Sequence, residues 1–308
     1  MTTVGSSTST GAFYERAVLD IGSLRGQAEG LQASLSSGQR LARSSDDPVA
    51  ASRLRQLSRA DALSNIDVSN ARLASGDLQL ADGALTTLAS FVTRIQELTT
   101  QAANGTLSDA QRAGIAAEIN QVRGNIVQLA NTRNSAGDAL FGGQTAGDAY
   151  TLDGAGNATY AGTATAGELP LGDGQAVTRS LTGPEFLNFS VSGAPTDLLA
   201  ALKTLSDGLA AGGPAAQAAA VAGLSALDAG LDAITTAQTV VGTRLSWIDL
   251  VGDRRVDVSE MRAGEESDIG GTDIAATVAR LQETMTVLEA SQASFTRLAG
   301  LSLFDMIR

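Results

Sequence analysis

The chain has 308 residues and a formal net charge of −12, and it contains neither histidine nor cysteine. Their absence excludes Ser-His-Asp and Cys-His nucleophile systems, imidazole acid–base catalysis and zinc sites with His or Cys ligands. The acidic balance argues against a nucleic-acid backbone or an anionic membrane surface as the main partner. No run of about 18 apolar residues stands out either. We therefore expect a non-enzymatic chain without metal or cofactor, with no nucleic-acid partner and no membrane insertion.

The first strong pattern is an apolar stripe that predicts a helix over residues 18–35. Its members recur at steps of three and four, which places them on one helix face: Ile21, Leu24, Ala28, Leu31 and Leu35. Gly38 follows as a candidate residue just beyond the helix end. In residues 44–48 an aspartate can cap free amides, and Pro48 suits a first helical turn, so a long helix should begin there.

This long helix carries a later stripe formed by Leu85, Leu88, Val92, Ile95, Leu98 and Ala102. Asn104 and Gly105 should close it. Ser108 and Gln111 then match a capping box, which predicts the start of another helix. That helix has the cleanest four-three alternation of the chain, formed by Ile115, Ile119, Val122, Ile126 and Leu129.

The composition changes between residues 141 and 195. This stretch holds 11 of the 34 glycines and 3 of the 5 prolines of the chain, which predicts a separate β-rich domain. Residues 150–152 and 158–160 should form strands around a hairpin turn at 153–157, which carries too few carboxylates for a calcium loop. Two further strands are predicted at 175–180 and 186–191.

Helical patterns return after Pro195. Thr196 or Asp197 should cap a helix that carries Leu198, Leu202, Leu205 and Leu209, and residues 212–214 interrupt the pattern. A second long stripe then comprises Val221, Leu224, Leu227, Leu231, Ile234, Gln238, Val241, Leu245 and Ile248. The last stripe comprises Ile274, Val278, Leu281, Met285, Leu288 and Phe295.

Eight glycines lie inside these helical patterns, although each costs about 1 kcal/mol relative to alanine. We expect them to permit close approach between helices; they are Gly76, Gly83, Gly114, Gly124, Gly223, Gly230, Gly242 and Gly252. The acidic residues of 265–268, with Asp273, lack the spacing of a metal-binding loop and predict a solvated linker.

Charge differs between the two ends of the chain. Residues 40–59 contain five arginines and two aspartates, a net charge of +3, whereas residues 253–289 contain four arginines and nine acids, a net charge of −5. Two interpretations remain open at this point. The segments are either independent solvated faces, since exposed ion pairs contribute only about 0–1 kcal/mol each, or they dock within or between subunits.

The apolar stripes are too narrow for isolated helices, so the N- and C-terminal arms must pair. We predict a mainly α fold in which the two arms form a coiled-coil-like rod of long antiparallel helices, with a small β-rich inserted domain. The expected domains are a paired-helix assembly domain (1–42 and 268–308), a helical rod domain (43–140 and 196–267) and a β-rich outer domain (141–195).

Several motifs, in this order, resemble the flagellin superfamily. They are LSSGQRL at 35–41, SDDPVAASR at 45–53, QAANGTLS at 101–108, LANTR at 129–133, FGG at 141–143 and LSLFDMIR at 301–308. The Pro-Val-Ala that follows the paired acids and the Leu-Ser-Leu-Phe near the end resemble the branch that joins the flagellar hook to the filament. A filament-forming flagellin is the alternative.

This resemblance implies a structural axial component of the bacterial flagellum, located outside the cell at the hook–filament junction and exported by the flagellar type III apparatus. The implied partners are further copies of the chain, flagellin, an adjacent hook-associated protein and a flagellar export chaperone. The terminal helices would line the tube wall and the β insert would project outward. We name as the candidate assembly interface Leu24, Leu31, Leu35, Arg40, Asp46, Asp47, Leu281, Met285, Leu288, Phe295, Leu303 and Phe304.

Overall fold

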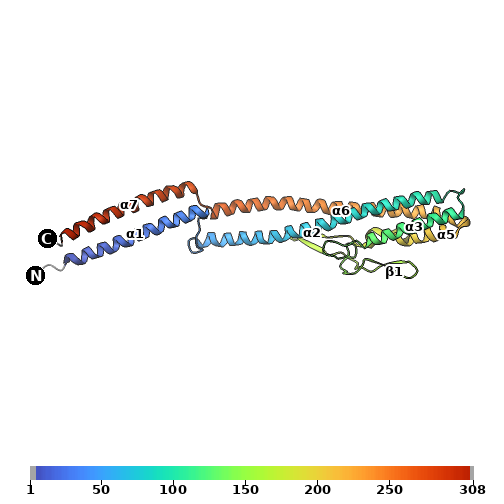
Figure 1. The fold of residues 1–308 in the computed structure, drawn as a ribbon, viewed down its shortest axis with the longest axis horizontal. Helices are drawn as coiled ribbons and strands as arrows, with labels where there is room; N and C mark the ends of the chain where they lie inside the picture. Colours follow the sequence, from blue (N-terminus) through green and yellow to red (C-terminus); the bar gives the residue numbers. More distant parts are fainter. Residues whose placement is uncertain (1–4, 306–308) are drawn as a thin grey trace. The chain divides into compact units, whose positions relative to one another are not determined.

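The structure is a computed structural model that describes residues 5–305, with side chains described for residues 12–298. It is mainly helical, as predicted, and three small β hairpins are inserted between the helical arms (Figure 1). The chain divides into two compact units: unit 1 contains residues 1–61 and 258–308, and unit 2 contains residues 62–257. Helices α2 (Pro48–Ala102) and α6 (Gly213–Gly270) contribute residues to both units.

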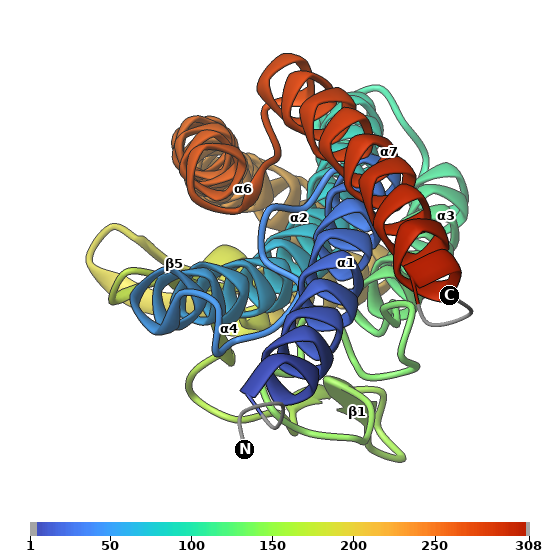
Figure 2. The same ribbon diagram turned by 90° about the vertical axis from the view of Figure 1, so that its left-hand side faces the viewer.

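In unit 1, helices α1 (Gly5–Ser37) and α7 (Ile274–Asp305) lie side by side (Figures 1 and 2). The predicted α1 stripe is confirmed, since all five of its members are half-buried. The α7 stripe is wrong at Ile274 and Met285, which are exposed. The half-buried face runs through Val278, Leu281, Thr284 and Leu288, because the helical period places polar Thr284 rather than Met285 on that face.

Unit 2 contains the hydrophobic core of the described chain. The α2 stripe from Leu85 to Ala102 is buried at all six predicted positions. Helix α3 (Asp109–Ala130) begins with the predicted capping box of Ser108 and Gln111, and it packs against α5 (Leu198–Ala211). The caps and stripes of these helices therefore follow from local sequence alone.

Helices α5 and α6 also form as expected, with one difference in the buried face. Asp197 caps α5 by accepting a 2.9 Å hydrogen bond from the amide of Ala200. In α6, Leu227 and Ile234 are buried as predicted, whereas Val221 is exposed and Ala220 is buried in its place. Small side chains thus pack the first turns of α6.

An 18-residue stretch of α6 has a mean hydropathy of 1.3, enough to cross a membrane by length and composition alone. This differs from the expectation that no run of about 18 apolar residues stands out. Ala216, Ala220 and Leu227 of the same helix pack in the core of unit 2. Only 22% of the stretch is buried, and one stretch of this kind is weak evidence for a membrane span.

The predicted close approach at helical glycines is confirmed at two positions only. A Cβ added at Gly223 would lie 2.7 Å from Leu205 Cδ1, and one added at Gly230 would lie 3.0 Å from Leu198 Cδ1. At the other six glycines no helix of the described chain approaches within 4 Å of that position, so the prediction is not met within the chain at Gly76, Gly83, Gly114, Gly124, Gly242 and Gly252. Their missing side chains face outward rather than toward a helix of the same chain.

The first hairpin matches its prediction in detail. Strand β1 (Tyr150–Leu152) pairs antiparallel with β2 (Ala158–Tyr160), with Tyr150 opposite Tyr160. Asp153 Oδ1 orders the turn by accepting hydrogen bonds from the amides of Ala155 and Asn157. This aspartate therefore acts as a turn residue, as expected.

The other hairpins differ from prediction. Strand β3 (Glu168–Gly172), which was not predicted, pairs with β4 (Gln175–Thr178), and β5 (Asn188–Val191) pairs with β6 (Ala194–Asp197). The predicted strand at 186–191 is wrong at its first two residues, which belong to the short helix α4 (Gly183–Leu187). A capping box of Thr182 and Glu185 starts this helix, with a proline in its first turn.

Candidate assembly site

Two linkers of unit 1, residues 38–47 and 271–273, are joined by backbone hydrogen bonds. The amide of Arg40 donates to the carbonyl of Gly270 at 2.8 Å, and the amide of Thr272 donates to the carbonyl of Gly38 at 2.9 Å. Gly38 has φ of +69°, the left-handed conformation expected where α1 ends. The end of α1 and the start of α7 are therefore held together as one two-stranded connection.

The side chain of Arg40 adds further contacts to this connection. Its Nε and Nη2 atoms donate to the carbonyl of Ile269 at 3.2 and 2.8 Å, at the end of α6, where a cation complements the helix dipole. Nη2 also lies 3.5 Å from Asp47 Oδ2, while Asp47 Oδ1 caps α2 by accepting from the amide of Ala50 at 3.0 Å. The Ala50 amide chiefly, with a contribution from Arg40, lowers the pKa of Asp47. Arg40 thus connects the end of α6 to the cap of α2.

One ion pair joins the basic segment 40–59 to the acidic segment 253–289 inside the chain, because Arg53 Nη2 donates to Glu265 Oε2 at 2.8 Å. Arg262 Nη1 donates to Asp61 Oδ1 at 2.7 Å, which joins the same two helices with the opposite polarity. Hydrogen bonding by Arg53 lowers the pKa of the Glu265 carboxyl. Of the two open interpretations, docking within the chain is the one that the Arg53–Glu265 pair supports.

The expected solvated linker at 265–268 is wrong, because these residues form the last turns of α6. Only residues 271–273 lie between α6 and α7, and Asp273 caps α7 by accepting from the amide of Ala276 at 3.0 Å. Of these acids, Glu265 pairs with Arg53 of α2, a contact between arms that spacing along the sequence does not reveal.

Near the other end of the α1 and α7 pair, Tyr14 joins the two helices. Its hydroxyl donates to the carbonyl of Leu298 at 3.1 Å, and its ring packs edge-on against Phe295 with centroids 5.6 Å apart. Even so, no side chain among residues 12–37 and 274–298 is buried. The pair therefore presents half-covered apolar stripes.

A groove of about 620 Å³ lies beside the connection in unit 1. It brings together four of the predicted interface residues, Leu24, Leu31, Arg40 and Asp46. Arg280, Glu283 and Val287 of α7 also line it and were missed, although their spacing of three and four residues marks a second face of that helix.

The remaining predicted interface residues lie outside this groove. Leu35, Leu281, Leu288 and Phe295 are half-buried, and Met285 is exposed. Helix α7 includes Leu303 and Phe304, whose side chains lie outside the described part of the chain.

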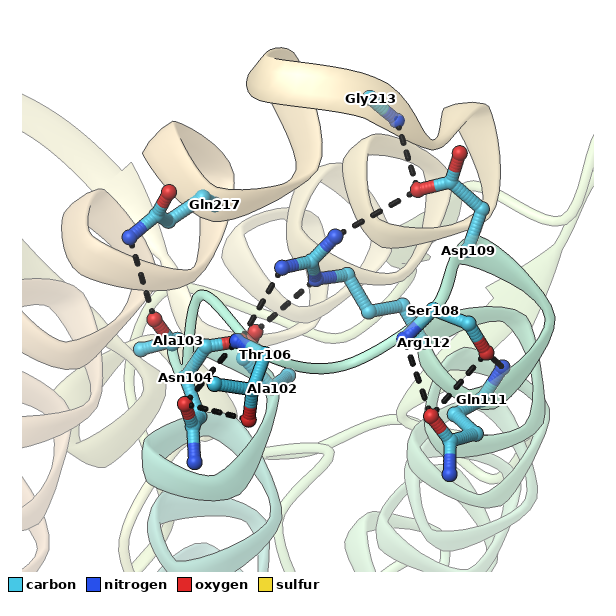
Figure 3. Close-up of polar contacts among 10 residues, drawn as sticks. All are labelled: Ala102, Ala103, Asn104, Thr106, Ser108, Asp109, Gln111, Arg112, Gly213 and Gln217. Atoms are coloured by element: carbon cyan, nitrogen blue, oxygen red, sulfur yellow. Dashed lines mark hydrogen bonds and ion pairs between the residues drawn. The ribbon is translucent and has the colours of Figure 1, made fainter.

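A second polar site, in unit 2, surrounds Arg112 and was not predicted (Figure 3). The Arg112 side chain is buried, with Nε donating to the carbonyl of Ala102 at 3.2 Å and Nη2 donating to the carbonyl of Asn104 at 3.1 Å. These carbonyls belong to the motif at 101–108 that resembles the flagellins. Arg112 thus supplies a donor to the carbonyl of Ala102, the last residue of α2, and a second donor to the carbonyl of Asn104, which also accepts from the amide of Leu107.

Neighbouring contacts attach this loop to the turn between α5 and α6. Asp109 Oδ1 accepts from the amide of Gly213 at 2.9 Å, and Gln217 Nε2 donates to the carbonyl of Ala103 at 3.3 Å (Figure 3). Asp109 also lies 3.4 Å from Arg112. These contacts hold the loop after α2 against the start of α6.

Comparison with known proteins gives one family and a consistent set of relatives. The model of the bacterial flagellin N-terminal helical region matches residues 9–146. Flagellar hook-associated protein 3 of Escherichia coli is 28% identical over 88% of this chain and 90% of its own length. The protein of the same name from Salmonella typhimurium is 26% identical over 97% of this chain and 99% of its own length.

Solved structures show the same fold. A flagellar hook-associated protein from Vibrio parahaemolyticus aligns with a TM-score of 0.67 at 23% identity, covering 73% of this chain and all of that one. The flagellar junction protein FlgL from Legionella pneumophila aligns with a TM-score of 0.59 at 16% identity, covering 71% of this chain and 99% of that one.

Proposed function

We propose that this chain, which is similar to flagellar hook-associated protein 3, is a structural subunit joining the flagellar hook to the filament. The observation that carries the proposal is the match to hook-associated protein 3 along 88% and 97% of the chain, which includes both helical arms. The relationship makes the chain a component of the flagellum and a structural protein rather than an enzyme.

We further propose that the assembly interface lies in unit 1. The half-covered stripes of α1 and α7 support this, because a pair of helices without a buried side chain leaves apolar surface that neighbouring subunits can cover. The proposed interface consists of Leu24, Leu31, Leu35, Arg40, Asp46, Asp47, Leu281, Met285, Leu288, Phe295, Leu303 and Phe304. Within it, Arg40 holds the connection and the apolar residues supply the contact.

The proposed partners are further copies of the chain, flagellin on the filament side and an adjacent hook-associated protein on the hook side. We propose export through the flagellar type III apparatus, with a chaperone that holds the last helix before assembly. In the assembled flagellum, residues 1–42 and 268–308 would line the tube wall, residues 43–140 and 196–267 would form the middle shell, and residues 141–195 would project outward.

A strain that lacks this chain tests the proposal. We expect intact hooks without filaments, with flagellin released into the medium, and we expect the wild-type chain supplied from a plasmid to restore filaments. Normal filaments in the deletion strain would contradict the proposal. If the deletion removes the most abundant protein of the filament, the chain is itself that protein, which would support the alternative of a filament-forming flagellin.

A further inference from the structure

Asn104 and Gly105 form the single Asn-Gly dipeptide of the sequence, in the loop between α2 and α3. Both residues are exposed. An asparagine followed by glycine can convert to aspartate without an enzyme, because the backbone nitrogen of the next residue attacks the side-chain amide and a glycine has no Cβ to block the approach. Three atoms decide how readily the folded loop reacts: the attacking nitrogen, the side-chain oxygen and the departing nitrogen.

The side-chain oxygen of Asn104 accepts two hydrogen bonds from Thr106. The Thr106 amide donates to Asn104 Oδ1 at 3.1 Å, and the Thr106 hydroxyl donates to the same atom at 3.0 Å (Figure 3). Attack on the amide carbon moves negative charge onto this oxygen. The two donors are already in place to stabilise that charge, as the donors of an oxyanion hole are.

The attacking and departing nitrogens are not held by hydrogen bonds within the described part of the chain. The Gly105 amide has no backbone acceptor there, and Asn104 Nδ2 points away from the other labelled residues of Figure 3. The backbone carbonyl of Asn104, by contrast, accepts from Arg112 Nη2 at 3.1 Å and from the Leu107 amide at 3.3 Å. The turn is therefore fixed while the two reacting nitrogens stay available.

Asn134 provides an internal comparison. Its Oδ1 also accepts two hydrogen bonds, from the amides of Ala136 and Asp138, each at 3.0 Å. However, Asn134 is half-buried and is followed by Ser135, whose side chain hinders approach of the attacking nitrogen. Only Asn104 combines the polarised side-chain oxygen with a following glycine.

We propose that Asn104 is a site of spontaneous deamidation in the folded chain. The Gly105 nitrogen forms a bond to Asn104 Cγ, the bond between Cγ and Nδ2 breaks, and ammonia leaves with the proton of the Gly105 amide, which gives a succinimide. Water then opens the ring at either carbonyl and gives aspartate or isoaspartate. The inference does not depend on the proposed function.

Conversion changes the loop that joins α2 to α3. Either product adds a negative charge, and isoaspartate also takes the carbonyl that Arg112 binds out of the main chain and lengthens the main chain by one carbon. Because no enzyme is needed, the fraction of converted chains increases with time after folding. The modification therefore records the age of the chain.

Peptide mapping by mass spectrometry tests the site in the purified full-length chain, incubated at mildly alkaline pH in water that carries a heavy oxygen isotope. Conversion replaces the amide by a carboxyl that contains labelled oxygen. We expect Asn104 to convert before any other asparagine, Asn134 included. Gly105→Ala should suppress the conversion, and the variant fits the fold because the added Cβ would have only Gln217 Nε2 nearby, at 3.9 Å.

A matched pair of variants tests the contribution of the folded loop. Thr106→Val keeps the amide donor and removes the hydroxyl, so the folded variant should convert about tenfold more slowly, the effect of losing one hydrogen bond to a developing charge. Thr106→Ser keeps the hydroxyl and should convert at the wild-type rate. In urea the three proteins should convert at equal rates, and the folded wild-type chain should convert at least as fast as the unfolded one.

An intact Asn104 in the folded chain, or faster conversion at another asparagine, would overturn the proposal. Faster conversion in urea than in the folded chain would overturn it too, because the fold would then protect Asn104. Equal rates for folded wild-type and folded Thr106→Val chains would likewise show that the loop does not promote the reaction.

Discussion

Arg53 Nε and Nη2 donate hydrogen bonds to the two carboxylate oxygens of Glu265, at 2.5 and 2.8 Å, and so join α2 to α6 within unit 1. Paired hydrogen bonds of this kind fix the orientation of both side chains. The pair joins segments 212 residues apart in sequence and lies outside the large hydrophobic cluster of unit 2.

The titration of Glu265 should report this pair directly. Because Arg53 lowers its pKa below the ordinary value of 4.5, the stabilising contribution is present above pH 4.5 and is lost as the pH falls through the folded-state pKa. We expect an NMR titration of the Glu265 carboxyl carbon to show a midpoint below 4.5, and Arg53→Gln to raise it. Arg59→Gln, at an exposed arginine of the same helix, should leave the midpoint unchanged. Equal midpoints in all three proteins would contradict the pairing.

Limited proteolysis of the purified chain should trim both ends before it cuts the helical core. The described parts of α1 and α7 contain no buried side chain, whereas α2, α3, α5 and α6 share the core of unit 2. We expect mass spectrometry to find a persistent core from about residue 45 to residue 260, with further cuts in the hairpins. Full resistance of residues 1–35 would show that the helix pair is stable without neighbours.

Arg112→Gln should destabilise unit 2 because it leaves the carbonyls of Ala102 and Asn104 without their charged donor. We expect urea denaturation to show a loss of about 2–4 kcal/mol in the free energy of unfolding. The matched control is Arg94→Gln, which breaks exposed ion pairs with Glu97 and Glu118 and should cost about 1 kcal/mol or less. Equal losses in the two variants would show that the buried site around Arg112 stabilises the fold no more than exposed ion pairs do.

Phe186→Ala should destabilise the helices as well as the hairpins, because Phe186 is buried against Phe141 in the same core as α2 and α6. We expect Phe186→Ala to lower the free energy of unfolding by about 3–5 kcal/mol. The helical circular dichroism signal should then disappear in a single unfolding transition, under milder denaturing conditions than in the wild-type chain. Leu152→Ala, at an exposed position of the first hairpin, should have little effect. An unchanged helical transition in Phe186→Ala would mean that the hairpins fold apart from the helices.

The features that the sequence predicted well are local. Asp47, Ser108 and Asp197 cap helices as expected, because a cap depends only on the next few backbone amides. The stripes of α1, α2 and α5 follow for the same reason, since helical periodicity is set along the chain.

The features that were missed depend on contacts between distant segments. Strand β3 lies against α2, where Asn70 Nδ2 donates to the carbonyl of Pro170 at 3.0 Å, and no local pattern indicates this. The local sequence around Arg112 does not distinguish it from other helical arginines, because its burial depends on contact with the loop at 101–108. In α7, hydrophobicity favoured Met285, whereas the helical period places Thr284 on the half-buried face and leaves Met285 exposed.

Immunogold labelling of isolated flagella with an antibody against this chain tests the central claim most directly. The account predicts that the label is confined to a narrow band between hook and filament. Label spread along the whole filament, or absent from flagella of a strain that expresses the chain, would contradict it.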